Sequence, residues 1–89
     1  MGGAIVTRIL YFASLRQMAG KSEETLDLGE GATVRALGEL IGKTSPELGE
    51  MILGKKVMVS VNQDVATLDT PVRDGDEVAF LPPFSGGAV

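Results

Sequence analysis

The alternation of apolar and polar side chains predicts five strands along the chain. Residues two apart share a character, as strand geometry requires, and several segments are rich in branched and aromatic side chains. The predicted strands cover Ala4–Ala13, Glu24–Leu28, Val57–Val61, Val65–Leu68 and Glu77–Leu81, with the second antiparallel to the first. In the later strands, the residues expected to point inward are Val57, Val59, Val61, Val78 and Phe80.

The two faces of the first strand differ in composition. One set contains Ile5, Thr7, Ile9 and Tyr11, and the other contains Val6, Arg8, Leu10 and Phe12. Arg8 indicates that the second set faces water, which leaves Leu10 and Phe12 as apolar residues on an open face. The alternative is a strand buried on both faces. Leu81 alternates with Phe80 and would point to the same face as Phe12.

The spacing between the strands predicts one main helix and one shorter one. The main helix runs from Val34 to about Lys43, with Thr33 as its N-cap. Gly38 indicates a close approach of this helix to the sheet, or is simply tolerated. The shorter helix begins at Ser45-Pro46, with Ser45 capping, and ends at Gly54-Lys55-Lys56. Ser14–Glu24 is expected to be a polar connection with a single helical turn.

This order, β-β-α-β-β-β with a short extra helix, predicts an α+β fold. It comprises a mixed four- to five-stranded sheet with one main helix packed on one face. Because one helix covers only one face, the other face must be polar or used for binding. We expect one domain over residues 1–81, followed by a flexible tail over residues 82–89.

Composition excludes several kinds of chemistry. The 89-residue chain has a net charge of −4, which argues against nucleic acid or an anionic membrane as its partner. It contains neither Cys nor His, so a thiol nucleophile, a Ser-His pair and a zinc site are excluded, and we predict no metal site. Asp74, Asp76 and Glu77 lack the spacing of a calcium loop and indicate a solvated turn. With no transmembrane segment or signal peptide visible, a cytoplasmic location is expected.

The last residues combine stiffness with a thin tip. Pro82-Pro83 ends the last strand, because proline fixes φ and donates no backbone hydrogen bond. Gly86-Gly87 has no side chains and can enter a narrow slot. A frayed terminus is the alternative, but the strand, the prolines and the glycines together favour a presented tail.

Several blocks of residues, taken in order, resemble one known family. They are Tyr11–Arg16, Ala19-Gly20, Thr33–Leu37, Val61–Gln63, Asp74–Phe80 and Pro82–Gly87. Together they resemble the MoaD-like small subunits of molybdopterin synthase, within the ubiquitin-like MoaD/ThiS family of sulfur carriers. The resemblance covers nearly the whole chain and implies the ubiquitin-like β-grasp fold. Archaeal ubiquitin-like modifiers share much of the same pattern.

The resemblance implies chemistry at the carboxylate of Gly87, with Gly86 as its thin neighbour. In the family, a ubiquitin-activating-like adenylating enzyme uses ATP to form an acyl-adenylate there, and sulfur then replaces AMP to give a thiocarboxylate. The tail enters the large subunit of molybdopterin synthase and donates sulfur to cyclic pyranopterin, in molybdenum cofactor biosynthesis. The chain itself is expected to bind no cofactor and to have no turnover alone.

The resemblance also implies residues that contact a partner. Phe12, Leu81 and Val65 would form an apolar docking patch, with Arg16 as a polar contact at its rim. The tail contributes Pro82, Pro83, Phe84 and Ser85. The alternatives are that Phe12 and Leu81 belong to the core and that Arg16 is a solvated loop charge.

One departure from the family pattern affects the chemistry. Ala88-Val89 follow Gly87, so the free carboxylate belongs to Val89. A metalloprotease that trims such extensions, a remnant of cloning, or a protein that only binds would each account for this. Two further functions stay open: a ubiquitin-like modifier joined through Gly87 to lysines, and a non-covalent β-grasp interaction module.

Overall fold

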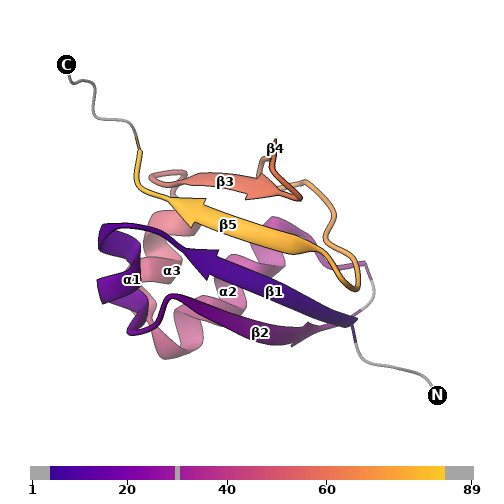
Figure 1. The fold of residues 1–89 in the computed structure, drawn as a ribbon, viewed down its shortest axis with the longest axis horizontal. Coiled ribbons are helices and arrows are strands. Elements are labelled where there is room, and N and C mark those ends of the chain that lie inside the picture. The colour runs from indigo at the N-terminus through magenta and orange to yellow at the C-terminus, as the bar shows by residue number, and fades with distance from the viewer. Residues whose placement is uncertain (1–4, 30, 84–89) are drawn as a thin grey trace.

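The computed structural model describes residues 5–29 and 31–83, arranged as one five-stranded sheet and three helices (Figure 1). The strands are β1 (Ile5–Tyr11), β2 (Glu23–Leu28), β3 (Met58–Val61), β4 (Asp64–Val65) and β5 (Glu77–Leu81). The helices are α1 (Ser14–Ala19), α2 (Val34–Thr44) and α3 (Pro46–Leu53). The predicted strand at Glu77–Leu81 is therefore confirmed at both ends.

The sheet is mixed, with strand order β2-β1-β5-β3-β4. The first and last strands of the chain, β1 and β5, lie parallel at its centre, and every other pair is antiparallel. Because β1 and β5 pair through Ile9–Val78 and Tyr11–Phe80, the two ends of the domain are held together across the middle of the fold. The predicted α+β class with a mixed sheet is confirmed.

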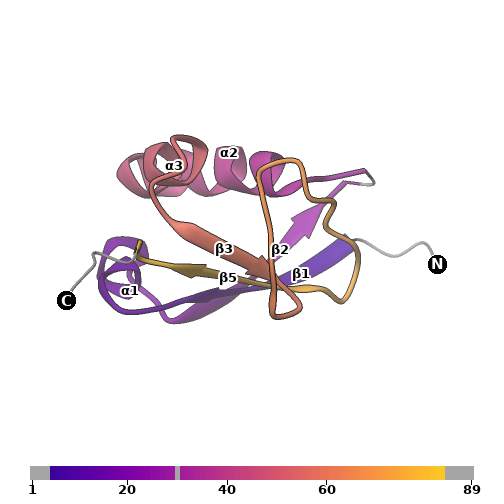
Figure 2. The same ribbon diagram turned by 90° about the horizontal axis from the view of Figure 1, so that it is seen from above.

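One face of the sheet carries the core. Figure 2 shows α2 and α3 together above one face, with α1 near one end of the sheet. Buried side chains come from both layers and from the loop before β5: Ile9, Tyr11, Leu15, Val34, Leu37, Ile41, Leu48, Ile52, Leu68, Val72, Val78 and Phe80. Val61 is buried as well, while Val57 and Val59 are half-buried, so the predicted inward set is confirmed. The side chain of Ile5 lies outside the described residues.

Glycines let α2 and α3 cross at close range. A Cβ atom added to Gly49 would lie 2.4 Å from Cα of Gly42, and one added to Gly38 would lie 2.8 Å from Cγ2 of Ile52. The close approach predicted at Gly38 therefore exists, but it is made to α3 and not to the sheet. α3 packs on the same side as α2, and a side chain at the crossing would push the two helices apart.

The two predicted helix caps have different outcomes. The hydroxyl of Thr33 accepts a hydrogen bond from the amide of Ala36 at 3.3 Å, as an N-cap does. Ser45 occupies the N-cap position of α3, with Pro46 first in the helix, but its side chain makes no capping bond. The predicted side-chain cap at Ser45 is therefore wrong, and Ser45 joins the two helices through its backbone alone. Its amide donates to Ile41 at the end of α2, and its carbonyl accepts from Gly49 of α3.

Two connections differ from the prediction. The segment after β1 is a six-residue helix, α1, because Leu15 is fully buried and anchors it; the sequence predicted only a single turn. Of the predicted strand at Val65–Leu68, only Val65 lies in the sheet, as the last residue of β4. Beyond Ala66 the chain leaves β3, because Leu68 turns into the core and a Thr67–Thr70 bond closes a tight turn.

The buried aromatic pair on β1 and β5 includes the chain's single tyrosine. The rings of Tyr11 and Phe80 stack with centroids 6.2 Å apart, and the Tyr11 hydroxyl donates to the Glu24 carboxylate. Burial, that hydrogen bond and the negative charge of Glu24 all raise the pKa of Tyr11 well above its ordinary value. The phenol therefore stays protonated in the folded protein at pH values where a free tyrosine ionises.

The helix crossing predicts opposite effects for two matched substitutions. Gly49→Ala should lower the free energy of unfolding by about 1–3 kcal/mol, because its methyl group has no room against α2. Gly42→Ala places a methyl group 3.5 Å from Gly49, an ordinary contact, and should be neutral or stabilising by up to ~1 kcal/mol through helix propensity. Chemical denaturation of both variants measures the free energy of unfolding. Equal changes in the two variants would contradict the close crossing of α2 and α3 at Gly49.

The tyrosine predicts a loss of stability at alkaline pH. The unfolded chain releases the Tyr11 proton near pH ~10 and the folded chain holds it, so stability is retained below pH ~10 and falls as pH rises above it. Tyr11→Phe should show a smaller alkaline loss. Ultraviolet absorbance can follow the single tyrosine directly. Tyrosinate forming near pH ~10 while the protein is still folded would contradict the raised pKa.

Candidate functional site

The face of the sheet opposite α2 and α3 carries an exposed apolar surface. β1 points Thr7, Ile9 and Tyr11 into the core, which leaves Val6 and Phe12 exposed by 40% and 43%. The predicted open face of β1 is therefore confirmed, and burial on both faces is wrong for this domain. Among the described large apolar side chains that are exposed, Val65 is the most open, at 87%.

Strand register gathers these side chains into two adjoining rows. Met58 pairs with Leu81, and one step beyond the Tyr11–Phe80 pair brings Phe12 beside Leu81. The amide of Phe12 donates to the carbonyl of Phe80 at 3.1 Å, which fixes this position. The neighbouring row runs from Leu10 through Ala79 and Ser60 to Val65. We call the apolar members of these rows the open-face patch: Leu10, Phe12, Met58, Val65, Ala79 and Leu81.

The structure brings together some predicted contact residues and leaves others apart. Phe12 and Leu81 are neighbours, and Val65 lies on the same face two strands away from β5. Arg16 is exposed on α1, which lies at the end of the sheet where β5 leads into the tail (Figure 1). Whether Arg16 borders an interface stays a prediction. The sequence prediction missed Met58, although alternation through Val57 and Val59 would have placed it on this face.

A charged cluster borders the patch on β1. Arg8 lies between Glu23 of β2 and Glu77 of β5, at 3.1 Å and 3.4 Å. All three side chains are substantially exposed, so the ion pairs contribute little to stability. Their position marks a change from apolar to charged surface, the pattern of a docking core with a polar rim.

The backbone at the start of α1 is held in an unusual conformation. Ala13 has φ 54° and ψ −131°, a region that favours glycine, and its carbonyl accepts from the amide of Arg16 at 3.0 Å. The carbonyl of Phe12 accepts from Leu15 at 3.1 Å. Because Leu15 is fully buried, this turn is anchored to the core and holds Phe12 at the edge of the patch.

The tail begins beside the patch. β5 ends at Leu81, a patch residue, and Pro82 and Pro83 follow it, half-buried and exposed respectively. Phe84, Ser85, Gly86 and Gly87 lie outside the described residues, as do Ala88 and Val89. The predicted contact roles of these tail residues, and the flexibility predicted for the tail, therefore stay predictions. A partner that covers Phe12 and Leu81 would lie next to the root of the tail.

The acidic turn before β5 has a structural role. Asp74 accepts a hydrogen bond from the amide of Val6 at 2.8 Å, which joins the turn to β1. Asp76 accepts from the side chain of Asn62 and from the amide of Arg73, and these bonds lower the pKa of its carboxyl group. Within residues 5–29 and 31–83, no group of three possible metal-binding side chains comes together. No helix in that part of the chain is long and apolar enough to cross a membrane.

Comparisons with known proteins agree over nearly the whole chain. The model of the ThiS family matches residues 9–87. A molybdopterin synthase sulfur carrier subunit from Chlamydomonas reinhardtii is 40% identical over 82 residues, covering 90% of this chain and 96% of the relative.

Two solved structures extend the similarity to the fold. A Pyrococcus furiosus protein described as molybdopterin converting factor, subunit 1, has a TM-score of 0.81 at 36% identity, covering 91% of this chain and 100% of that one. SAMP1 from Haloferax volcanii, a small archaeal modifier protein, has a TM-score of 0.79 at 28% identity, covering 92% and 99%. The predicted ubiquitin-like β-grasp fold is confirmed, and the chain belongs to the ThiS family, alongside the molybdopterin synthase sulfur carrier subunits.

Proposed function

We propose that this chain is the sulfur-carrying small subunit of a molybdopterin synthase, acting through the carboxylate of Gly87. The observation that carries the proposal is the position of the tail root, at the end of the central strand β5 and beside the exposed patch. A partner can grip the domain through Phe12, Met58 and Leu81 while the tail reaches into its active site. The family relatives, named sulfur carrier subunits, support the same function.

The chemistry needs no catalytic side chain from this protein. A terminal carboxylate is ionised at neutral pH and attacks the α-phosphorus of ATP, which forms an acyl-adenylate and releases pyrophosphate. A sulfur nucleophile supplied by a donor then displaces AMP and leaves a thiocarboxylate on Gly87. Delivery of that sulfur to cyclic pyranopterin would take place on the large subunit. The absence of Cys and His from the sequence fits a carrier whose reactive group is its own terminus.

The partners follow from these steps. The large synthase subunit would bind the patch and accept the tail, and an adenylating enzyme would use ATP to activate Gly87. Because Ala88-Val89 follow Gly87 in the sequence, a protease must remove them before the carboxylate is available. We place these steps in the cytoplasm, where the sequence leads us to expect the protein.

A protein-modifier function is the second candidate, supported by the similarity to SAMP1. Both functions share adenylation at Gly87 and differ in what attacks next. Sulfur gives a carrier, whereas the amine of a lysine gives an isopeptide bond to another protein. The form of the tail recovered from the cell therefore distinguishes them.

The patch predicts loss of binding without loss of folding. Phe12→Lys or Leu81→Lys should weaken binding to the large subunit by about thirtyfold or more, equivalent to ~2 kcal/mol, because an unpaired charge would enter an apolar interface. Thr25→Lys, which introduces the same charge on the same face opposite Arg8, should bind normally. Calorimetry measures affinity and circular dichroism measures folding.

Two outcomes would contradict the proposal that the large subunit docks on the open-face patch. If Phe12→Lys or Leu81→Lys unfolds the domain, that residue is part of the core and the assignment of faces is wrong. If both fold and bind normally, the partner docks elsewhere. Val78→Lys serves as the unfolded reference, since Val78 is fully buried on the helix side of the sheet.

The tail predicts a gain of activity on truncation. Deleting Ala88-Val89 should make the chain a substrate for the adenylating enzyme, whereas the chain ending at Val89 should not react. Gly87→Ala in the truncated chain should reduce activity strongly, because the added methyl group widens the tip and restricts its backbone. The assay is ATP-dependent AMP formation, with mass detection of the adenylate or thiocarboxylate. Equal reaction of both chain lengths would show that trimming is unnecessary.

A further inference from the structure

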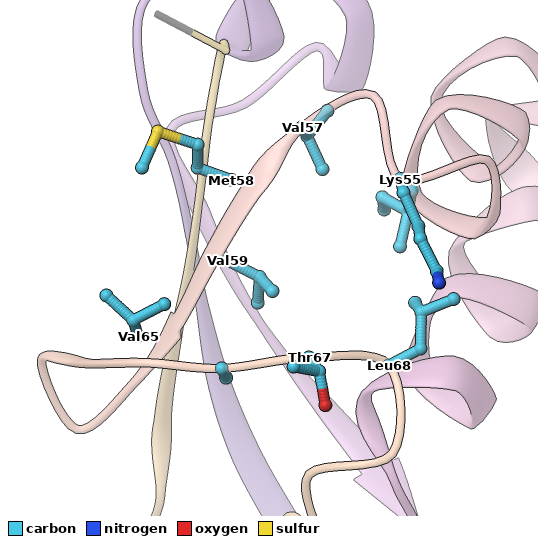
Figure 3. A pocket seen from close by; sticks show the side chains of 9 residues that line it. Lys55, Val57, Met58, Val59, Val65, Thr67 and Leu68 are labelled. Carbon is cyan, nitrogen blue, oxygen red and sulfur yellow. The ribbon is translucent and has the colours of Figure 1, made fainter.

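A second apolar surface continues the open-face patch around the edge of the sheet. Figure 3 shows a groove between β3, residues 65–68 and α3. Its volume is about 290 Å³. Its walls include Ile52, Val57, Val59, Ala66 and Leu68, and Met58 and Val65 belong both to it and to the patch. The volume is at the lower limit for small-molecule sites, so the groove has room for one or two side chains.

The groove exists because β4 separates early from β3. Only Ser60–Val65 and Val61–Asp64 pair as strand residues, and the last contact is a 2.9 Å bond from the Ala66 amide to the Val59 carbonyl. Asn62 donates to Glu77 of β5, so the alternation of an antiparallel ladder directs Ser60 to β5 and Val59 to the β4 side. Among the described residues the amide of Val59 has no backbone acceptor, so it is a free donor at a sheet edge.

Lys55 stands at the other side of the groove in a strained conformation. After the C-cap Gly54, the amides of Lys55 and Lys56 donate to Ile52 and Met51 at 3.1 Å and 2.8 Å, which is the Schellman pattern. Lys55 occupies the left-handed position of that motif, with φ 62°, where glycine is favoured. A lysine at a position that favours glycine raises the conformational free energy of the folded backbone, and a role in binding would account for its presence.

The ammonium group of Lys55 is available to a partner. Within the described part of the chain, no carboxylate lies within ion-pair distance of Lys55. The nearby Asp69 pairs with Arg35 at 2.8 Å; Arg35, and to a smaller extent the charge of Lys55, lower the pKa of Asp69. In Figure 3 the Lys55 side chain runs along the α3 side of the groove. The groove thus offers an apolar floor, a backbone donor and a cation.

We infer that this groove receives an extended segment of the large synthase subunit. The segment would accept a hydrogen bond from Val59, place an apolar side chain over Leu68 and pair a carboxylate with Lys55. Shared residues Met58 and Val65 make the groove continuous with the patch, so one partner would cover both surfaces. The inference rests on the proposed function, and it adds strand pairing at the sheet edge to docking on the open face.

The experiment separates stability from binding. In the chain ending at Gly87, Lys55→Gly should raise the melting temperature, because glycine relieves the strain, and should weaken binding of the purified large subunit by about tenfold or more. Lys56→Ala removes the same charge from the next residue, which does not line the groove, and should bind normally. Hydrogen exchange should be fast at the Val59 amide in the free chain and slow in the complex, with Ser60 slow in both.

The outcomes distinguish this inference from the proposed function. If Phe12→Lys abolishes binding while Lys55→Gly binds normally and Val59 stays unprotected, the groove is not occupied and the carrier function stands. If the unmodified chain does not bind the large subunit at all, the proposed function fails and the inference fails with it. Self-association that Lys55→Gly abolishes would make a second copy of this chain the occupant and would overturn the inference.

Discussion

The parallel pairing of β1 with β5 is the constraint on which the site depends. It joins residues almost seventy positions apart in sequence and places them at the centre of the sheet. The same register that stacks Tyr11 on Phe80 inside the core brings Phe12 beside Leu81 on the outside. Because the chain leaves the sheet at the end of β5, the tail begins next to Phe12, Met58 and Leu81 of the patch.

The helix layer determines which face of the sheet stays open. α2 and α3 cross closely through Gly42 and Gly49, and together they cover one face. Neither α2 nor α3 covers the opposite face of the sheet (Figure 2). The apolar side chains on that face of β1, β5 and β3 are therefore exposed or half-buried. A monomer that leaves Val65 87% exposed and Phe12 and Met58 each 43% exposed gains by covering them with another protein.

The sequence predicted the fold and much of the patch because both follow from local rules. Alternation placed Phe12 and Leu81 on one face, and Thr33 marked the start of α2. The helix partner of Gly38 and the length of α1 were missed, because they depend on tertiary packing around Ile52 and Leu15. The groove could not be predicted, since it arises where residues 66–68 leave β3, in a segment whose pattern resembles a strand.

The intact mass of the protein recovered from its native cell tests the central claim most directly. A sulfur carrier should include a form that ends at Gly87 and is heavier than the free acid by the mass difference between one sulfur and one oxygen. Recovery of only the full chain through Val89 with an ordinary carboxylate, or of Gly87 joined to lysines of other proteins without any thiocarboxylate, would contradict the account.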